Sequence, residues 1–187
     1  MTAVGDCLRQ HIDRYCGPKP SGLHREERLG ISVARFDDLP DRGLITSITI
    51  GLAAHLLGQK SGRGIRQELM TCADERYAHL PWHEILLAVG KQILDRDAAL
   101  MRGEVIGPAG PLFPEATWSH VTALMCTSPT MFDEDFGETI CDDNPLVIVE
   151  LVPITSGEAQ WIRKNGWSAF FDRVNAGEVD IFDLARS

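Results

Sequence analysis

The sequence predicts an α+β fold, with helices packed on a mixed or antiparallel sheet in a single domain. Two early segments show the period-two pattern of strands, and other segments carry apolar residues at helical spacing. Strand patterns followed by helical patterns are typical of α+β proteins. The chain has 187 residues, 44% of them hydrophobic, which is enough to bury a full core in one domain.

The first expected element is a helix over residues 3–15. One helical face carries side chains at spacings of four, four and three residues, namely Val4, Leu8, Ile12 and Tyr15. The sequence Cys16-Gly17-Pro18 should end this helix, because proline cannot continue the hydrogen-bonded turns. Residues 19–27 are interpreted as a polar connection.

Three strands are expected next. Residues 29–34 and 44–50 both alternate with a period of two, and the second segment is rich in β-branched side chains. The turn-forming sequence 38–43 lies between them, which favours a hairpin or meander. A further turn over 58–64 precedes a third strand at 65–73.

A longer helix should begin at Pro81, since proline suits the first helical turn. Its apolar stripe, which extends to a boundary at residues 102–103, consists of Ile85, Leu86, Val89, Ile93 and Leu100. A rigid turn over 107–111 follows, and then strands at 119–127 and 146–152. Glu150 shares its strand parity with apolar residues, and we favour a solvated sheet face over a buried, cation-paired position for it.

The C-terminal part carries the clearest local signals. Pro153 is expected to end the preceding strand, and Thr155 with Glu158 fits the capping box that opens a helix. Gly166 should end that helix, and a second amphipathic helix follows. The aromatic residues of this region are expected in the core rather than in an exposed binding cluster, and they are Trp161, Trp167, Phe170 and Phe171.

Composition limits the partners. Asp and Glu outnumber Lys and Arg by 27 to 18, and the formal net charge is -9. Such a charge repels phosphate backbones and anionic lipids, so we expect neither nucleic acid nor membrane as partner. No apolar run is long enough for a secretion signal or a membrane span. The five cysteines contain no Cys-x-x-Cys pair, which argues against disulfides and structural zinc and favours a reducing cytoplasm.

The most distinctive feature is an acidic loop within residues 133–143. Its six carboxylates belong to Asp133, Glu134, Asp135, Glu138, Asp142 and Asp143. The order of ligands does not match an EF-hand calcium loop. A solvated face is one interpretation. The other, and our first choice for a partner-binding site, is an electrostatic docking surface for a basic protein.

The residues that could support catalysis form no recognised motif. His79 and His83 are followed by Glu84 in the pattern H-x-x-x-H-E, which differs from the zinc-protease pattern, and Pro81 should place His79 before the helix. The Gly58–Gly64 segment lacks the Lys-Ser/Thr ending of a phosphate loop. A small Cys/His-dependent hydrolase remains the alternative, and it predicts a polar pocket that joins two or more of Cys72, His55, His83 and His120.

Several segments together resemble the suppressor of fused family. Their order and spacing are similar to those of family elements. The segments are the apolar run 146–155 followed by Glu158, the helix 82–100, the segments 103–106 and 110–112, and the closing sequence 183–186. The resemblance covers roughly residues 29–186. It implies a protein-binding role without chemistry, and the short single-domain form resembles bacterial members, which act largely as immunity proteins against partner toxins.

The sequence therefore predicts an N-terminal helix and connection over 1–28 and a suppressor-of-fused-like domain over 29–187. The expected function is non-enzymatic binding of another protein, possibly a basic toxin domain, which is neutralised by occlusion. No cofactor or metal is expected. Besides the hydrolase, a scaffold that serves only a homo-oligomer stays open, and it predicts a large exposed apolar patch.

Overall fold

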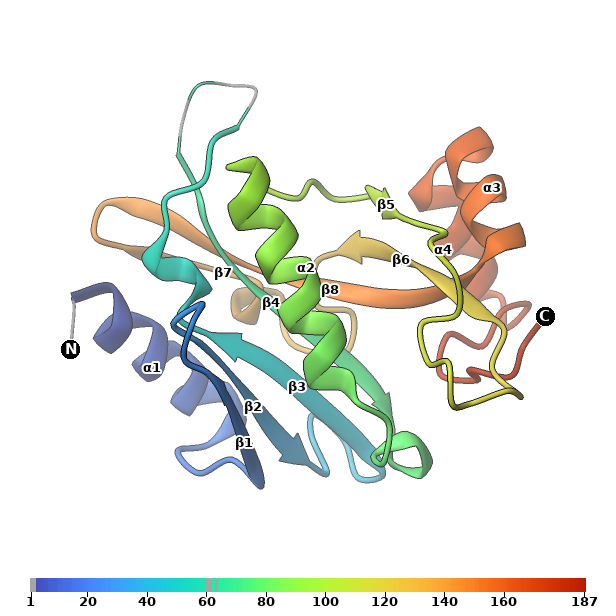
Figure 1. Cartoon of the computed structure of the whole chain (residues 1–187), viewed down its shortest axis with the longest axis horizontal. Helices are drawn as coiled ribbons and strands as arrows, with labels where there is room; N and C mark the ends of the chain where they lie inside the picture. The colour runs from blue at the N-terminus through green and yellow to red at the C-terminus, as the bar shows by residue number, and fades with distance from the viewer. Residues whose placement is uncertain (1–2, 60–61, 63) are drawn as a thin grey trace. The chain divides into compact units, whose positions relative to one another are not determined.

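The computed structural model describes residues 3–59, 62 and 64–187, and it confirms the α+β class. Helices accompany a mostly antiparallel set of strands (Figure 1). The chain divides into two compact units. The first unit contains Met1–Leu100 and Ser128–Glu150, and the second contains Met101–Thr127 and Leu151–Ser187.

The sheet of the first unit is built mainly from consecutive antiparallel strands. These are β1 (Gly22–Glu26), β2 (Ile31–Asp37), β3 (Leu44–Ile50) and β4 (Arg66–Asp74). Strand β8 (Asn144–Thr155) then pairs with β4 in parallel, with Arg66 opposite Leu146. The expected meander is confirmed. The prediction of a polar connection over 19–27 is wrong, because β1 occupies most of these residues. As an exposed edge strand, β1 has no buried face and hence no apolar alternation.

The acidic segment is also more regular than a loop. A short 3-10 helix, η3 (Glu134–Phe136), leads into β7 (Glu138–Cys141), which pairs antiparallel with the start of β8. Asp142 and Asp143 form the two-residue turn, and both have a positive φ, of 53° and 59°. Aspartate tolerates this left-handed conformation better than most residues, and such turns match the twist of a β-hairpin.

Helices cover the sheet of the first unit. The predicted N-terminal helix is α1 (Ala3–Cys16), and its buried residues are Val4, Leu8 and Ile12. Helix α2 (Trp82–Arg96) lies across β2, β3 and β4 (Figure 1). It ends before Leu100, whose backbone N–H and C=O are instead both bound by the buried Gln67 amide at 2.9 and 2.8 Å. Two further 3-10 helices are η1 (Leu52–Ala54) and η2 (Glu75–Tyr77).

The second unit contains the pair β5 (Val105–Ile106) and β6 (Val121–Thr127), the end of β8, and two helices. Helix α3 (Ser156–Asn165) opens with the predicted capping box, because the Thr155 hydroxyl accepts from the Glu158 N–H and the Glu158 carboxylate accepts from the Thr155 N–H. Helix α4 (Trp167–Asn175) follows Gly166. One expectation is wrong: β8 continues through Pro153 to Thr155.

The predicted aromatic core of the second unit is confirmed. Phe170 is fully buried, and Trp161, Trp167 and Phe171 pack against the same cluster. Cations lie over two of the indole rings: the Arg102 guanidinium lies 4.3 Å from the Trp167 ring centroid, and that of Arg173 lies 5.3 Å from the Trp161 ring centroid. Among the described residues, no helix combines the length and the apolar character needed to cross a membrane.

Candidate functional site

The six predicted carboxylates lie together on one structural feature, which we call the acidic hairpin (residues 133–143). Asp133 precedes η3, Glu134 and Asp135 lie within it, Glu138 begins β7, and Asp142 and Asp143 form the turn into β8. All six residues are exposed. Ile140, in the middle of β7, is also 63% exposed. The surface thus combines a dense negative charge with one apolar side chain.

An aromatic cluster holds the base of the acidic hairpin against α1. Phe136 is fully buried, and its ring lies 4.2 Å from Phe132, 5.3 Å from Tyr15 and 5.8 Å from His11, measured between centroids. The His11 ring nitrogen Nε2 is also 2.9 Å from the carbonyl oxygen of Phe136. These contacts fix the backbone from which the carboxylates project.

A disulfide between Cys7 and Cys141 attaches β7 to α1, which overturns the expectation that the chain contains no disulfide. The two cysteines are separated by 134 residues in the sequence. No local spacing motif can reveal such a pair, because only the packing of α1 beside β7 brings the two thiols together. Cys16, Cys72 and Cys126 are free.

The acidic hairpin is neutralised at one position only among the residues that the structure describes. The guanidinium of Arg66 lies 3.5 Å from Asp142, while the same side chain donates to the carbonyl oxygens of Ala53 and Ala54. The other five carboxylates form no ion pair within the described ranges. Their charge is therefore available to a cationic partner.

The expectation for Glu150 is wrong, because this residue is buried. One of its carboxylate oxygens accepts hydrogen bonds from the Thr130 N–H at 2.6 Å and the Thr130 hydroxyl at 2.9 Å. Burial raises the pKa of Glu150 to about 7, and the hydrogen bonds from Thr130 oppose that shift without cancelling it. Glu150 thus serves to hold residue 130 rather than to face solvent.

Glu68 is a second buried carboxylate, which the sequence analysis did not single out. It accepts hydrogen bonds from the Thr49 hydroxyl and from the N–H groups of Gly51 and Ala53, at 2.9 and 3.0 Å for the two backbone donors. Burial raises the pKa of Glu68 to about 7 against the effect of these donors. A carboxylate in a strand buried on both faces carries no sequence signal that distinguishes it from an exposed one.

The residues proposed for the alternative hydrolase do not form a reactive group. Burial raises the pKa of the Cys72 thiol to about 12, with a further contribution from Glu150, so this thiol stays protonated and unreactive at neutral pH. His55 and His83 make no hydrogen bond with Cys72, and His120 lies exposed in the second unit. In the phosphate-loop candidate 58–64, residues 60, 61 and 63 lie outside the described residues. The described part of the chain also contains no cluster of three potential metal ligands.

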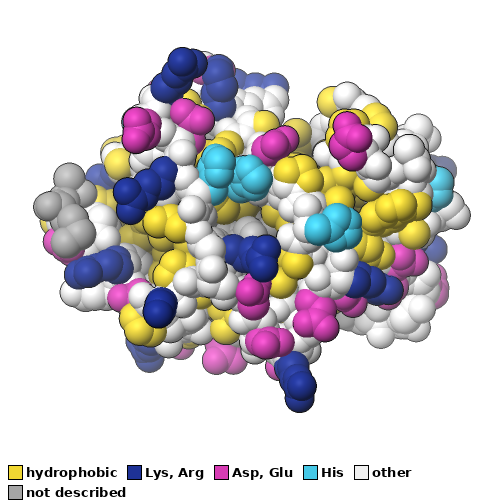
Figure 2. Space-filling view, turned by 60° about the horizontal axis from the view of Figure 1, so that its bottom comes forward, with side chains coloured by type: hydrophobic (Ala, Val, Ile, Leu, Met, Phe, Trp, Pro, Cys, Tyr) yellow, Lys and Arg dark blue, Asp and Glu magenta, His cyan; other side chains and the backbone are white. Residues whose placement is uncertain are grey.

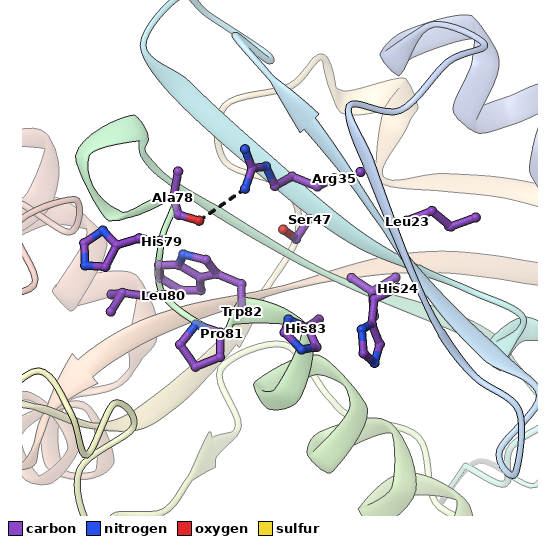
Figure 3. Close-up of a pocket in the computed structure, with 12 residues that line it drawn as sticks. Leu23, His24, Arg35, Ser47, Ala78, His79, Leu80, Pro81, Trp82 and His83 are labelled. Carbon is purple, nitrogen blue, oxygen red and sulfur yellow. Dashed lines mark hydrogen bonds between the residues drawn. The ribbon is translucent and has the colours of Figure 1, made fainter.

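A pocket of about 370 Å³ lies elsewhere in the first unit, between β1, β2 and the segment that enters α2 (Figure 3). His24 of β1 and His83 of α2 point toward one another, with ring centroids 4.2 Å apart. On the face shown in Figure 2, histidine side chains gather beside a hollow flanked by hydrophobic and basic side chains. The sequence alone does not pair His83 with His24, because these residues are distant in the chain.

Comparison with known proteins supplies the family. Residues 27–187 match the model of a family described as suppressor of fused protein (SUFU). The protein named immunity protein YqcF, from Bacillus subtilis (strain 168), is 22% identical over 160 residues, which span 83% of this chain and 80% of that protein.

Solved structures show the same fold. A chain in the Sufu–Fu complex superposes with a TM-score of 0.72 at 13% identity, over 96% of this chain and 85% of that chain. A suppressor of fused homologue from Neisseria gonorrhoeae FA 1090 gives a TM-score of 0.70 at 14% identity, over 98% of this chain and 95% of that chain. Suppressor of fused from Drosophila gives 0.58 at 17% identity, where the match spans 86% of this chain and 43% of the other.

Proposed function

This chain belongs to the suppressor of fused protein family, and we propose that it is a protein-binding module that neutralises a partner toxin by covering its functional surface. Two relatives support this proposal. One carries the name of an immunity protein, and a structural neighbour was solved in a complex named for two proteins. The proposed mechanism is occlusion by a preformed surface and involves no covalent chemistry.

The acidic hairpin is the observation that carries the proposal. Five of its six carboxylates have no ion-pair partner within the described residues, and the aromatic cluster with the Cys7–Cys141 disulfide holds them in place. A rigid negative surface attracts a basic partner and accelerates its association. Toxins that cleave nucleic acids need cationic surfaces to bind phosphates, so a toxin of this kind is a suitable basic partner for the acidic hairpin.

The test is a protection assay in which the chain is expressed together with each candidate toxin whose gene is found beside its own. We expect the wild-type chain to restore growth. The hairpin variant replaces the six carboxylates of Asp133, Glu134, Asp135, Glu138, Asp142 and Asp143 by their amides. It should associate with the purified toxin at least about tenfold more slowly at low salt, with a weaker dependence on salt.

A matched control variant separates local from overall charge. It replaces six exposed carboxylates outside the acidic hairpin by their amides, so both variants have the same net charge, and these are Glu27, Asp41, Glu75, Asp95, Glu115 and Asp172. We expect the control to bind with nearly the wild-type rate. Equal association rates for the wild type and the hairpin variant at low salt would exclude the acidic hairpin as the docking surface. Failure of the wild type to restore growth would exclude the immunity role against that toxin.

A further inference from the structure

The pocket beside β1 has a chemistry opposite to that of the whole chain. Although the chain has a formal net charge of -9, no Asp or Glu lines this pocket. Its titratable side chains are those of three histidines and one arginine, His24, His79, His83 and Arg35. A concave site with basic and neutral donors and without carboxylates is complementary to an anion.

The two facing imidazoles are free to bind a ligand. Neither His24 nor His83 makes a hydrogen bond to another described residue, and their rings contact each other at 4.2 Å with a tilt of 34°. Burial lowers the pKa of His83, and His24 lowers it further while Glu84 opposes both. A carboxylate bound at the edges of the two rings would accept a hydrogen bond from each and would favour protonation of one of them.

Arg35 completes the donor set from the opposite wall. Its Nη1 donates to the carbonyl oxygen of Ala78 at 3.2 Å (Figure 3), and its Nε donates to Asp37 at 2.7 Å. These two bonds fix the guanidinium, and Nη2 makes no hydrogen bond within the described ranges. Asp37 lines the neighbouring hollow rather than this pocket, and that hollow also contains Asp38, Asp74 and Glu75. An anion is therefore favoured on the histidine side of Arg35.

The remaining wall is apolar. The indole N–H of Trp82 donates to the carbonyl oxygen of Tyr77 at 2.9 Å, which holds the ring in place. Leu80, Pro81 and the half-exposed Leu23 extend this surface. The pocket also lies at the start of α2, which no side chain caps, and the first turn of a helix favours negative charge.

We infer that this pocket binds a carboxylate attached to an apolar group, with His24, His83 and Arg35 as the polar contacts and Trp82, Leu80 and Pro81 as the apolar wall. The carboxylate can belong to a free organic acid or to a peptide. This site is separate from the acidic hairpin, which suits a cationic partner, and it does not depend on the proposed function.

The test uses phenylacetate as the probe, followed by the imidazole and indole NMR signals of the full chain at pH 6.5. We expect saturable shifts of the His24, His83 and Trp82 signals. Phenylacetamide, which has the same ring without the charge, and inorganic phosphate, which has charge without the ring, should bind at least about tenfold more weakly, the effect of losing one charge-assisted hydrogen bond or one buried apolar group.

Substitutions locate the site. His24→Gln and His83→Gln should each weaken phenylacetate binding about fivefold or more, whereas His55→Gln, an exposed histidine outside the pocket, should leave it unchanged. His24 lies on an exposed edge strand, so its replacement should not affect folding. Absence of saturable shifts, equal binding of phenylacetamide, tighter binding of phosphate, or equal binding by wild type and both pocket variants would each overturn the inference.

Two peptide probes distinguish the sources of the carboxylate. Acetyl-Gly-Phe presents a chain-terminal carboxylate beside an aromatic ring, and acetyl-Glu-Phe-amide presents a side-chain carboxylate. Tighter binding of either peptide than of phenylacetate assigns the site to a protein ligand of that kind. Tighter binding of phenylacetate assigns it to a free acid.

Discussion

At the scale of single residues, the buried carboxylates Glu68 and Glu150 depart most from simple expectation. Both lie in neighbouring strands of the first unit and share one sheet face, because Met70 pairs with Glu150 in the β4–β8 register. Strand parity identified Glu150 as unusual, but parity does not tell whether a face is covered. The hydrogen bonds that accompany the burial of Glu150 come from Thr130, which lies 20 residues earlier in the sequence. No pattern in the sequence pairs these two residues.

The raised pKa of Glu150 predicts a pH-dependent stability. Its pKa is about 7 in the folded chain and 4.5 in the unfolded chain, so the folded state holds the extra proton between these values. The wild type should therefore lose stability as pH rises from about 4.5 to 7, by at most about 3 kcal/mol from this residue. Glu150→Gln should flatten this slope in urea unfolding measured at pH 5 and pH 7.5.

Glu115→Gln is the control for this measurement, because Glu115 is exposed. It should leave the slope as it is in the wild type. If Glu150→Gln changed the free energy of unfolding by the same amount at both pH values, the ionisation of Glu150 would not be linked to folding.

Arg186 provides a second prediction for a single residue. It donates to both carboxylate oxygens of Glu158, at 2.8 and 3.1 Å, and to the carbonyl oxygen of Pro153 at 2.6 Å. Glu158 also caps α3, so the arginine connects the last residues of the chain to the start of that helix. Arg186→Gln should lower the free energy of unfolding by about 2–4 kcal/mol, because it leaves a largely buried carboxylate without its cation.

The exposed pair Lys91–Asp95 offers a contrast to Arg186. Lys91→Gln should cost less than about 1 kcal/mol in the same urea unfolding experiment, since exposed pairs are screened by water and salt. Similar costs for the two substitutions would show that the Arg186 contacts contribute no more than a surface ion pair.

At the scale of elements, patterns with a clear period predicted well. Residues 44–50 were expected as a strand from their alternation, and β3 has the same bounds. Strand β1 was missed because its exposed positions need no alternation, and β7 was missed because its charged residues favour a loop. Strand β8 continues past Pro153, as a strand can where the missing N–H of proline is not needed for pairing.

The disulfide joins two elements and predicts a redox-dependent stability. Cys141→Ala should lower the free energy of unfolding by about 2–4 kcal/mol under oxidising conditions, because the disulfide closes a loop of 134 residues in the unfolded chain. With a reducing agent, the wild type should lose this advantage over the variant. Cys16→Ala removes a free thiol and serves as the control, with the redox difference retained.

The same disulfide makes the expected cytoplasmic location testable. Because cytosolic thiols are kept reduced, a cytoplasmic chain would hold Cys7 and Cys141 as a dithiol. Rapid alkylation of cell extracts should then label both residues, whereas a chain from an oxidising compartment would resist labelling until reduction. The cytoplasmic location itself stays a prediction until this measurement is made.

At the scale of the whole molecule, negative charge is unevenly distributed between surfaces of the chain. The excess of carboxylates is concentrated on the acidic hairpin, and the pocket beside β1 excludes them. Spacing along the sequence located the first feature, because its six residues lie within one hairpin. Sequence spacing could not locate the pocket, because its walls come from β1, β2 and the start of α2, which meet only after the sheet has formed.

The net charge of -9 predicts that the chain does not bind nucleic acid. Duplex DNA and single-stranded RNA should show no complex in fluorescence anisotropy at about 50 mM salt, where phosphate contacts are stronger than at physiological salt. Saturable binding that weakens with added salt would contradict this expectation and would point to a basic surface that the net charge conceals.

Strand β8 has a practical consequence for dissecting this protein. Its residues up to Glu150 belong to the first unit and those from Leu151 to the second, and the chain crosses between the units at two earlier points as well. Neither unit is therefore a contiguous stretch of polypeptide that truncation could isolate. A fragment library cut at the unit boundaries would divide a strand in its middle, so deletion mapping of partner binding should give way to point substitutions in the intact chain.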